Sequence, residues 1–376
     1  MDELTRRKDL KPPLLIDAYL VAATLVLVAS SLVMLYSTTG ILSQERFGDP
    51  LFYVKRQTVA ALVGLIGMWL CSRARSEHLQ KLSPFLLVIS LLLLVLPLLP
   101  GIGDAAGGAR RWVHLGPVRF QPGEFVKLLF VVYMAGYFSR HERELKGFFA
   151  GVFKPLMMVG FVGVLFLLQP DFGSTVVLAT VTLAMGAATG MRFRYLGMAA
   201  MFLALAMGGL VLVSPYRLAR ILSFLSPMND VSGKGYQLIQ SLIAVGSGQL
   251  TGVGLGESQQ KLFFLPAAHT DFIFAVIAEE LGFTGCVAVV GIFLLFLWRG
   301  LRIASRLAED TFAFSLTVGL TMLIVLPALL NVGVVIGLLP TKGMVLPLLG
   351  YGGSSLIACL MVVGLLLSFA RTLSRS

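Results

Sequence analysis

Apolar residues run almost without interruption along most of this 376-residue chain, in long stretches separated by short polar segments. A helix of about 20 mostly apolar residues spans the hydrocarbon core of a bilayer. Ten stretches match or approach that length, and each one predicts a membrane-spanning helix. They cover 14–38, 52–71, 84–100, 121–138, 155–170, 174–190, 195–214, 270–298, 311–338 and 347–370.

The composition agrees with a membrane protein. Hydrophobic residues make up 57% of the chain and charged residues 13%, and the mean hydropathy is +0.88. A soluble domain is nearer 45–50% apolar and about a quarter charged. These values exclude a soluble enzyme, a nucleic-acid-binding domain and a secreted disulfide scaffold. The chain is therefore predicted to be an all-α polytopic membrane protein, with 1–376 forming a single integral membrane domain.

The positive charges predict the orientation of the chain. Of the 30 Lys and Arg residues, 18 fall in the tail 1–13, the C-terminal tail and every second loop between spans. Cytoplasmic loops of membrane proteins accumulate Lys and Arg. Both termini are therefore predicted to be cytoplasmic, and the net charge of +11 needs no nucleic-acid partner.

The segment 215–269 between the seventh and eighth spans is predicted to be a long extracytoplasmic loop. Two runs of apolar residues in it recur at helical spacing, which is typical of amphipathic helices that lie on a membrane surface. The residues are Leu218, Ile221, Leu222 and Leu225 in the first run, and Leu238, Ile239, Leu242 and Ile243 in the second.

Ionisable groups at membrane depth are costly and therefore mark candidate functional sites. Glu124 and Lys127 lie three residues apart on one face of the fourth span, where they form either a functional pair or an ion pair that pins helices together. Arg110 and Arg111 lie in the preceding external loop, and arginine suits phosphate oxygens. Loop arginines are also commonly just solvated.

Three further candidates lie at the external ends of spans. Asp171 occupies a Pro-Asp-Phe-Gly turn, where a structural role is common. Asp271 stands where the external loop meets the eighth span; desolvation there favours a general base, and an N-cap role is the alternative. His269 is either a hydrogen-bonded structural residue or a proton shuttle. The glycines of 252–256 follow no strand, so a nucleotide loop is rejected.

Several of these motifs together resemble the SEDS family (shape, elongation, division and sporulation proteins) over about 14–371, and its division-type FtsW-like branch more than the RodA-like branch. The motifs are Arg111-Trp112 to Gly116-Pro117, Phe120-Gln121-Pro122-Gly123-Glu124 with Lys127, Gln169-Pro170-Asp171-Phe172-Gly173, Gly254-Leu255-Gly256-Glu257-Ser258 with Gln260-Lys261, Leu265-Pro266 with His269-Thr270-Asp271-Phe272, Glu279-Glu280-Leu281-Gly282, and Asn331 through Pro340-Thr341-Lys342-Gly343 to Tyr351-Gly352-Gly353-Ser354-Ser355. The chain departs from the family pattern at Gly123 and Gly350, where many members carry serine.

The resemblance implies a peptidoglycan glycosyltransferase that polymerises lipid II at the outer face of the bacterial cytoplasmic membrane during division. Its partners would be a class B penicillin-binding protein and other division membrane proteins. Asp271 matches the essential external aspartate of the family and is the predicted catalytic residue. The residues predicted to bind substrate are Arg110, Arg111, Gln121, Glu124, Lys127, Asp171, His269, Lys342 and Ser354, and those with a structural role are Glu280, Asn331, Gly352 and Gly353.

The sequence shows no metal-ligand cage, although a divalent cation (Mg²⁺ or Mn²⁺) could share the neutralisation of a diphosphate. Two other function classes fit the same residues: a flippase that moves lipid II across the membrane, and a non-catalytic division scaffold. The concentration of marked charges on the external side favours the enzyme over the flippase, which needs polar groups through both halves of the bilayer.

Overall fold

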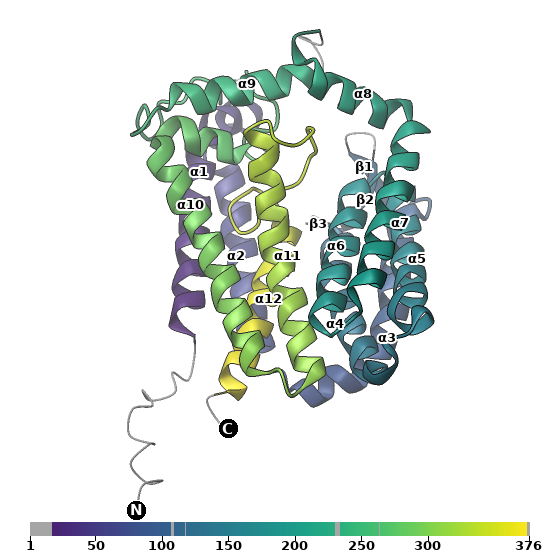
Figure 1. The fold of residues 1–376 in the computed structure, drawn as a ribbon. Helices are drawn as coiled ribbons and strands as arrows, with labels where there is room; N and C mark the ends of the chain where they lie inside the picture. The colour runs from purple at the N-terminus through teal and green to yellow at the C-terminus, as the bar shows by residue number, and fades with distance from the viewer. Residues whose placement is uncertain (1–16, 107–108, 117, 230–233, 263, 374–376) are drawn as a thin grey trace, which may run out of the picture.

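The structure is a computed structural model, and it describes the chain apart from residues 1–16, 107–108, 117, 230–233, 263 and 374–376. Within the described residues it is almost entirely helical (Figure 1). The α-helices are α1 (Ala18–Phe47), α2 (Phe52–Cys71), α3 (Ser76–Val95), α4 (Pro122–Arg140), α5 (Lys154–Leu168), α6 (Phe172–Ala188), α7 (Phe193–Leu212), α8 (Pro215–Leu225), α9 (Lys234–Ser247), α10 (Ile273–Arg306), α11 (Thr311–Val335) and α12 (Gly353–Thr372). Short 3₁₀ or π turns cover Leu96–Leu98, Glu142–Glu144, Phe149–Phe153 and Pro227–Asn229.

Each of the ten predicted spans overlaps one long helix, and the prediction of an all-α polytopic membrane protein is confirmed. Among the described residues, eight segments are long and apolar enough to cross a membrane; α6 is apolar but shorter, and α4 carries Glu124, Lys127 and Arg140. In Figure 1 the start of α1 and the end of α12 lie at the same end of the bundle, and α8 and α9 cross its other end. The tail 1–13, predicted to be cytoplasmic, lies outside the described residues.

The helix boundaries differ from the prediction at several ends. Helix α1 continues nine residues past the expected end at 38, because the hydroxyls of Thr38 and Thr39 bond to carbonyls of the preceding turn and Gly48 supplies a left-handed C-cap. Helix α3 starts before Pro84 rather than at it. Helix α12 begins at Gly353 rather than at 347, and the residues before it form a loop.

The amphipathic helices predicted within 215–269 are present as α8 and α9. The sequence analysis did not predict a sheet in the external segment before α4. There, β1 (Gly103–Ala106), β2 (Ala109–Leu115) and β3 (Val118–Phe120) form an antiparallel sheet in that order. Val113 pairs with Gly103 on one side and with Phe120 on the other. The strands are too short to give a clear period-two pattern, so the segment resembled an ordinary loop.

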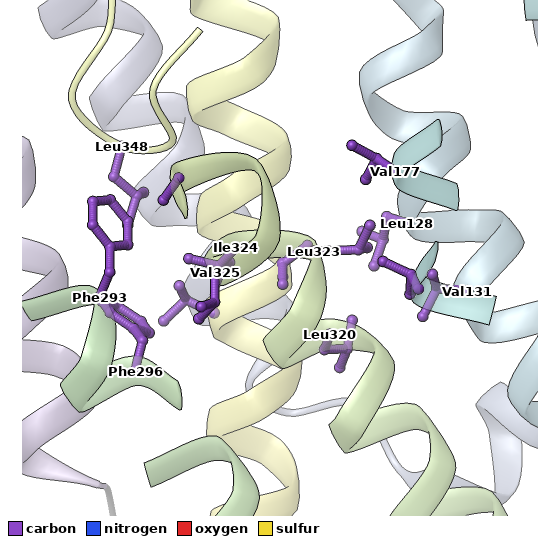
Figure 2. Close-up of a cluster of buried hydrophobic side chains, with 14 of the residues drawn as sticks. Leu128, Val131, Val177, Phe293, Phe296, Leu320, Leu323, Ile324, Val325 and Leu348 are labelled. Carbon is purple, nitrogen blue, oxygen red and sulfur yellow. The ribbon is translucent and has the colours of Figure 1, made fainter. Parts of the chain in front are cut away.

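Helix α11 forms the centre of the bundle and packs against α4, α6, α10 and α12. Its apolar side chains point to both sides (Figure 2). Ile324 and Val325 lie on the side of Phe293 of α10, and Leu323 lies next to Leu128 of α4. All but Leu323 are 4% exposed or less, so the middle of the bundle is a dry, packed core.

Helix α10 is broken near its outer end. Gly282 has φ 66° and ψ −163°, which interrupts the helical hydrogen bonds. The loop after α9 replaces them: the amides of Val253 and Gly254 donate to the carbonyls of Glu279 and Glu280 at 3.0 and 3.1 Å. Unpaired peptide groups are costly at membrane depth. The glycine-rich loop is thus a backbone partner for the break in α10.

Gly248, just after α9, tests this packing. A Cβ atom there would stand 1.8 Å from the carbonyl oxygen of Ala278, whereas one at Gly246 would meet no atom within 4 Å. Gly248→Ala forces backbone against backbone and is expected to destabilise the fold by about 1–3 kcal/mol. The melting temperature of the detergent-solubilised protein should fall by several degrees. Gly246→Ala is the matched control and should leave it unchanged or raise it; equal melting temperatures for both variants would contradict the packing.

Candidate active site

The loop between α11 and α12 enters the bundle without helical hydrogen bonds and is held by side chains of α1 and α2. The fully buried amide of Gln57 donates to the carbonyl of Gly350 at 3.3 Å and accepts from the amide of Gly352 at the same distance. The hydroxyl of Ser31 donates to the carbonyl of Leu349 at 2.8 Å. These bonds satisfy peptide groups that the membrane interior would otherwise leave unpaired.

Asn331 of α11 fastens the same loop to the segment that carries Asp271. Its amide nitrogen donates to the carbonyls of Asp271 and Met344, both at 2.7 Å. Asn331 is 2% exposed, so both bonds are shielded from water. Gly343 lies against the Asp271 side chain, and a Cβ there would stand 2.7 Å from Oδ2. The residue predicted to be structural thus positions the predicted catalytic one.

The carboxylate of Asp271 has no hydrogen bond or ion pair among the described residues, although the side chain is partly buried. It precedes α10, whose N-cap is Phe272, so it is not the N-cap itself. Burial raises the pKa of Asp271 to about 6, against the opposing positive charges of Arg111 and Arg220. A free carboxylate with this pKa is suited to accept a proton near neutral pH.

Asp171 has a different environment. It caps α6, and its two oxygens accept from the amide and the hydroxyl of Ser174 at 3.1 and 2.8 Å. Lys342 reaches across the same turn: a Cβ on Gly173 would stand 3.1 Å from its Nζ. Burial, together with the charges of three other cations, lowers the pKa of Lys342 to about 8, against the opposing charge of Asp171. The turn therefore places the amine of Lys342 beside the carboxylate of Asp171, which already accepts two hydrogen bonds from Ser174.

The side chain of Arg111 in β2 reaches this turn and donates hydrogen bonds to its backbone. Its Nε donates to the carbonyl of Gln169 at 3.1 Å, and Nη2 donates to the carbonyl of Pro170. Arg110, the preceding residue of the strand, is exposed and makes no hydrogen bond or ion pair with the other described candidates. Arg111 is therefore the arginine of the two that lies beside them.

Glu124 and Lys127 form an ion pair at 2.8 Å on α4, with side chains 13% and 18% exposed. At the N-cap of α4, the amide of Gln121 donates to the hydroxyl of Ser354 at 3.0 Å, which joins α4 to α12. The positive charge of Lys127 contributes to the lowered pKa of Lys342. The pair therefore belongs to the same charged region as the turn after α5.

His269 lies among aromatic rings. Its imidazole is 5.5 Å from the ring of Tyr53 and 5.9 Å from that of Tyr351, and its carbonyl accepts from the Tyr351 amide at 3.0 Å. Burial lowers the pKa of His269, so the imidazole is neutral at pH 7. This arrangement fixes the chain next to Asp271.

The two glutamates of α10 anchor the external loop instead of joining the site. Glu279 accepts from the hydroxyl of Ser258 and from the amide of Gln259. Glu280 pairs with Lys261 at 2.8 Å and accepts from Ser37 of α1 at 2.6 Å. Of the motif glycines, Gly352 bonds to Gln57 as described above, and Gly353 packs against Ala60 of α2.

Sequence reasoning missed Ser31, Gln57 and Arg220. A polar side chain inside an apolar span can signal a buried contact, but Ser31 adjoins Ser30 and Gln57 follows Lys55-Arg56, so neither stands out in the sequence. Arg220 stood on the polar face of a predicted surface helix, where solvation is the ordinary expectation. Its proximity to Asp271 depends on the tertiary structure.

The region offers few ligands for a metal ion. Among the residues that the structure describes, no group of three His, Cys, Asp or Glu side chains could hold one. Asp271 is a single free carboxylate, and both oxygens of Asp171 are engaged by Ser174. The donor set is dominated by cationic side chains, which fit an anion better than a divalent cation.

Comparisons with known proteins agree with this architecture. The model of the FtsW/RodA/SpoVE family of cell cycle proteins matches residues 17–375. The probable peptidoglycan glycosyltransferase FtsW of Thioalkalivibrio sulfidiphilus is 42% identical over 95% of this chain and 90% of that protein. Stage V sporulation protein E of Bacillus subtilis is 40% identical over 94% of this chain and 97% of that protein.

Two solved structures share the fold. A chain from a structure that describes the coordination of polymerization and crosslinking by a peptidoglycan synthase complex superimposes with a TM-score of 0.76, at 32% identity over 96% of this chain and 98% of that chain. The rod shape determining protein RodA of Thermus thermophilus superimposes with a TM-score of 0.69, at 30% identity over 95% of this chain and 97% of that chain. The extent of these matches, together with the arrangement of the site, shows that this chain belongs to the FtsW/RodA/SpoVE family.

Proposed function

We propose that this chain is a peptidoglycan glycosyltransferase that polymerises lipid II into glycan strands during cell division. The observation that carries the proposal is the free, partly buried carboxylate of Asp271 beside a group of cationic side chains. The names of the relatives support the reaction class. A carboxylate that accepts a proton and cations that hold a diphosphate are the two requirements of glycosyl transfer from a prenyl diphosphate.

In the proposed reaction, the 4-hydroxyl of the acceptor sugar attacks the anomeric carbon of the donor. The new glycosidic bond forms as the bond to the diphosphate oxygen breaks, and the leaving undecaprenyl diphosphate takes the electron pair. Asp271 accepts the hydroxyl proton, and the anomeric configuration is inverted. Arg111, Lys127 and Lys342 stabilise the negative charge that develops on the diphosphate.

A Mg²⁺ or Mn²⁺ ion that arrived with the diphosphate would find Asp271 as the one free carboxylate of the described site. In the proposed reaction, the cationic side chains of the protein therefore neutralise the negative charge of the diphosphate. No step in it depends on a metal.

The proposed location is the bacterial cytoplasmic membrane, with the site on the outer side. The site lies at the α8–α9 end of the bundle, and both described chain ends lie at the other, which carries most of the Lys and Arg residues. By analogy with the synthase complex that resembles this fold, a class B penicillin-binding protein is the proposed partner. Other division membrane proteins would assemble with that pair.

The packing in the middle of the bundle favours the enzyme over a lipid II flippase. Below Asn331, α11 contributes Leu320, Ile324 and Val325 to an apolar core (Figure 2), and the buried hydroxyls of Thr317 and Thr321 donate to carbonyls of their own helix. A sugar diphosphate crossing the membrane needs polar groups along its whole path. Polymer formation from lipid II by the purified protein and its partner distinguishes an enzyme from both a flippase and a scaffold.

Asp271→Asn tests the proposed base. It removes the proton acceptor with little change in size and should lower the rate of glycan formation by about a hundredfold or more. The assay is polymerisation of labelled lipid II by the purified protein with its partner, with melting temperature as the check on folding. Asp49→Asn is the control, because that carboxylate is exposed and pairs with Lys55 on the surface. Wild-type polymer from Asp271→Asn would remove this residue from the reaction.

The pH dependence of the reaction gives a second test. The general base acts only when it is deprotonated, and burial raises the pKa of Asp271 to about 6. The initial rate should therefore be level above this value and fall about tenfold for each pH unit below it. The measurement is kcat/KM for lipid II across this range, with thermal unfolding recorded at each pH. A rate that stays constant or rises on acidification would argue against a carboxylate base.

Asn331→Ala tests how Asp271 is held. The change removes the two hydrogen bonds to Asp271 and Met344, each worth about 1 kcal/mol, and frees the catalytic segment. We expect kcat to fall about tenfold, with a smaller change in KM. Ser315→Ala is the matched control, because its buried hydroxyl on the same helix has no hydrogen-bond partner. If both variants keep the wild-type kcat, Asn331 does not position the base.

A further inference from the structure

The surface helix α8 is fixed over the start of α6 by one of its two arginines. Nη1 of Arg217 donates to the carbonyl of Leu210 at 3.0 Å, and its guanidinium lies 5.3 Å from the ring centre of Phe172. Phe172 is the first residue of α6 and directly follows Asp171. Helix α8 therefore lies next to the turn that Arg111 and Lys342 approach from other sides.

Arg220 lies one turn further along α8, on the same side as Arg217. Nη2 of Arg220 donates to the hydroxyl of Tyr216 at 2.7 Å, and the guanidinium lies 4.8 Å from that ring. The Nε atom is buried and has no hydrogen-bond partner among the described residues. A charged donor that is buried without an acceptor is energetically costly. A bound ligand that provides an acceptor would remove this cost.

The surroundings of Arg220 hold more positive than available negative charge. The positive charge of Arg220 influences the pKa of both Asp271 and Lys342, so it lies within electrostatic reach of both. Lys127 is paired with Glu124, and Arg111 is engaged by two backbone carbonyls. Nε of Arg220 is buried without an acceptor, and the Lys342 amine forms no hydrogen bond or ion pair among the described residues. Two cationic donors without acceptors indicate a binding site for a multiply charged anion.

We propose that α8 is part of the substrate site and that Arg220 binds the diphosphate of a prenyl-linked sugar, opposite Lys342. The identity of this substrate rests on the function proposed above; the anion chemistry rests on the contacts of Arg220. A planar guanidinium with a free Nε and one engaged Nη2 can approach two phosphate oxygens from one edge. Helix α8 thus carries a binding residue of the site.

The first test is binding of farnesyl diphosphate to the purified full-length protein in detergent, measured by calorimetry. Arg220→Gln should weaken binding about tenfold to a hundredfold, the range expected for a charged hydrogen bond. Arg220→Lys keeps the charge and should recover part of the loss. Arg302→Gln removes the same charge from an exposed position near the far end of α10 and should bind as the wild type does. Wild-type affinity in Arg220→Gln, with an unchanged melting temperature, would overturn the inference.

Phosphate groups of membrane lipids are the other source of this chemistry. Competition with phosphatidylglycerol micelles distinguishes the two sources: displacement of farnesyl diphosphate only at a large excess of the lipid supports the diphosphate site. Displacement at equimolar lipid would overturn it in favour of a lipid headgroup site.

A kinetic readout separates the inference from the proposed function. In Arg220→Gln, KM for lipid II should rise, and the acidic limb of the pH–rate profile should move to higher pH because a positive charge near Asp271 is lost. A merely structural role would not move this limb. If the wild type forms no polymer but binds farnesyl diphosphate through Arg220, the proposed function fails and the anion site stands. If polymer forms with an unchanged KM and pH profile in Arg220→Gln, the inference alone fails.

Discussion

Peptide groups that are not part of a helix need partners inside a membrane bundle, and this requirement shapes the whole site. The loop before α12 and the segment before α10 both lack helical hydrogen bonds. Gln57, Ser31 and Asn331 supply the missing partners from three different helices. Asp271 and Lys342 are held on irregular backbone that a rigid frame supports. The chemistry of the site depends on these neutral side chains as much as on its charged ones.

Much of the fold could be predicted because long apolar runs have few alternatives. Each of the ten runs forms a helix, and the surface helices α8 and α9 follow from their apolar spacing. The external sheet could not be predicted, since β1 and β3 are short and gain their order from pairing with β2. The break at Gly282 depends on a loop that closes over it, and no local pattern describes that contact.

The residue types of the candidate site could be predicted from the sequence, but the interaction partner of each side chain could not. Glu279 and Glu280 are adjacent and look equivalent in the sequence, yet one anchors loop amides and the other pairs with Lys261. Arg110 and Arg111 also look equivalent, yet Arg111 donates to a carbonyl of the turn before α6 and Arg110 is exposed. Asp171 and Asp271 differ in the same way: Ser174 occupies one carboxylate, and the other is free. These distinctions arise from tertiary packing, which one sequence does not encode in its local pattern.

The side chain of Gln57 also has a mechanical consequence. Its amide presents a donor and an acceptor to Gly350 and Gly352, in the way that an adjoining peptide unit of a sheet would. A carboxylate only accepts and an ammonium group only donates, so neither could make both bonds. Because α1 and α2 hold the loop through Ser31 and Gln57 and α11 holds it through Asn331, the loop couples these three helices mechanically. A tilt of α1 and α2 relative to α11 would strain the loop and shift the amine of Lys342 relative to Asp171.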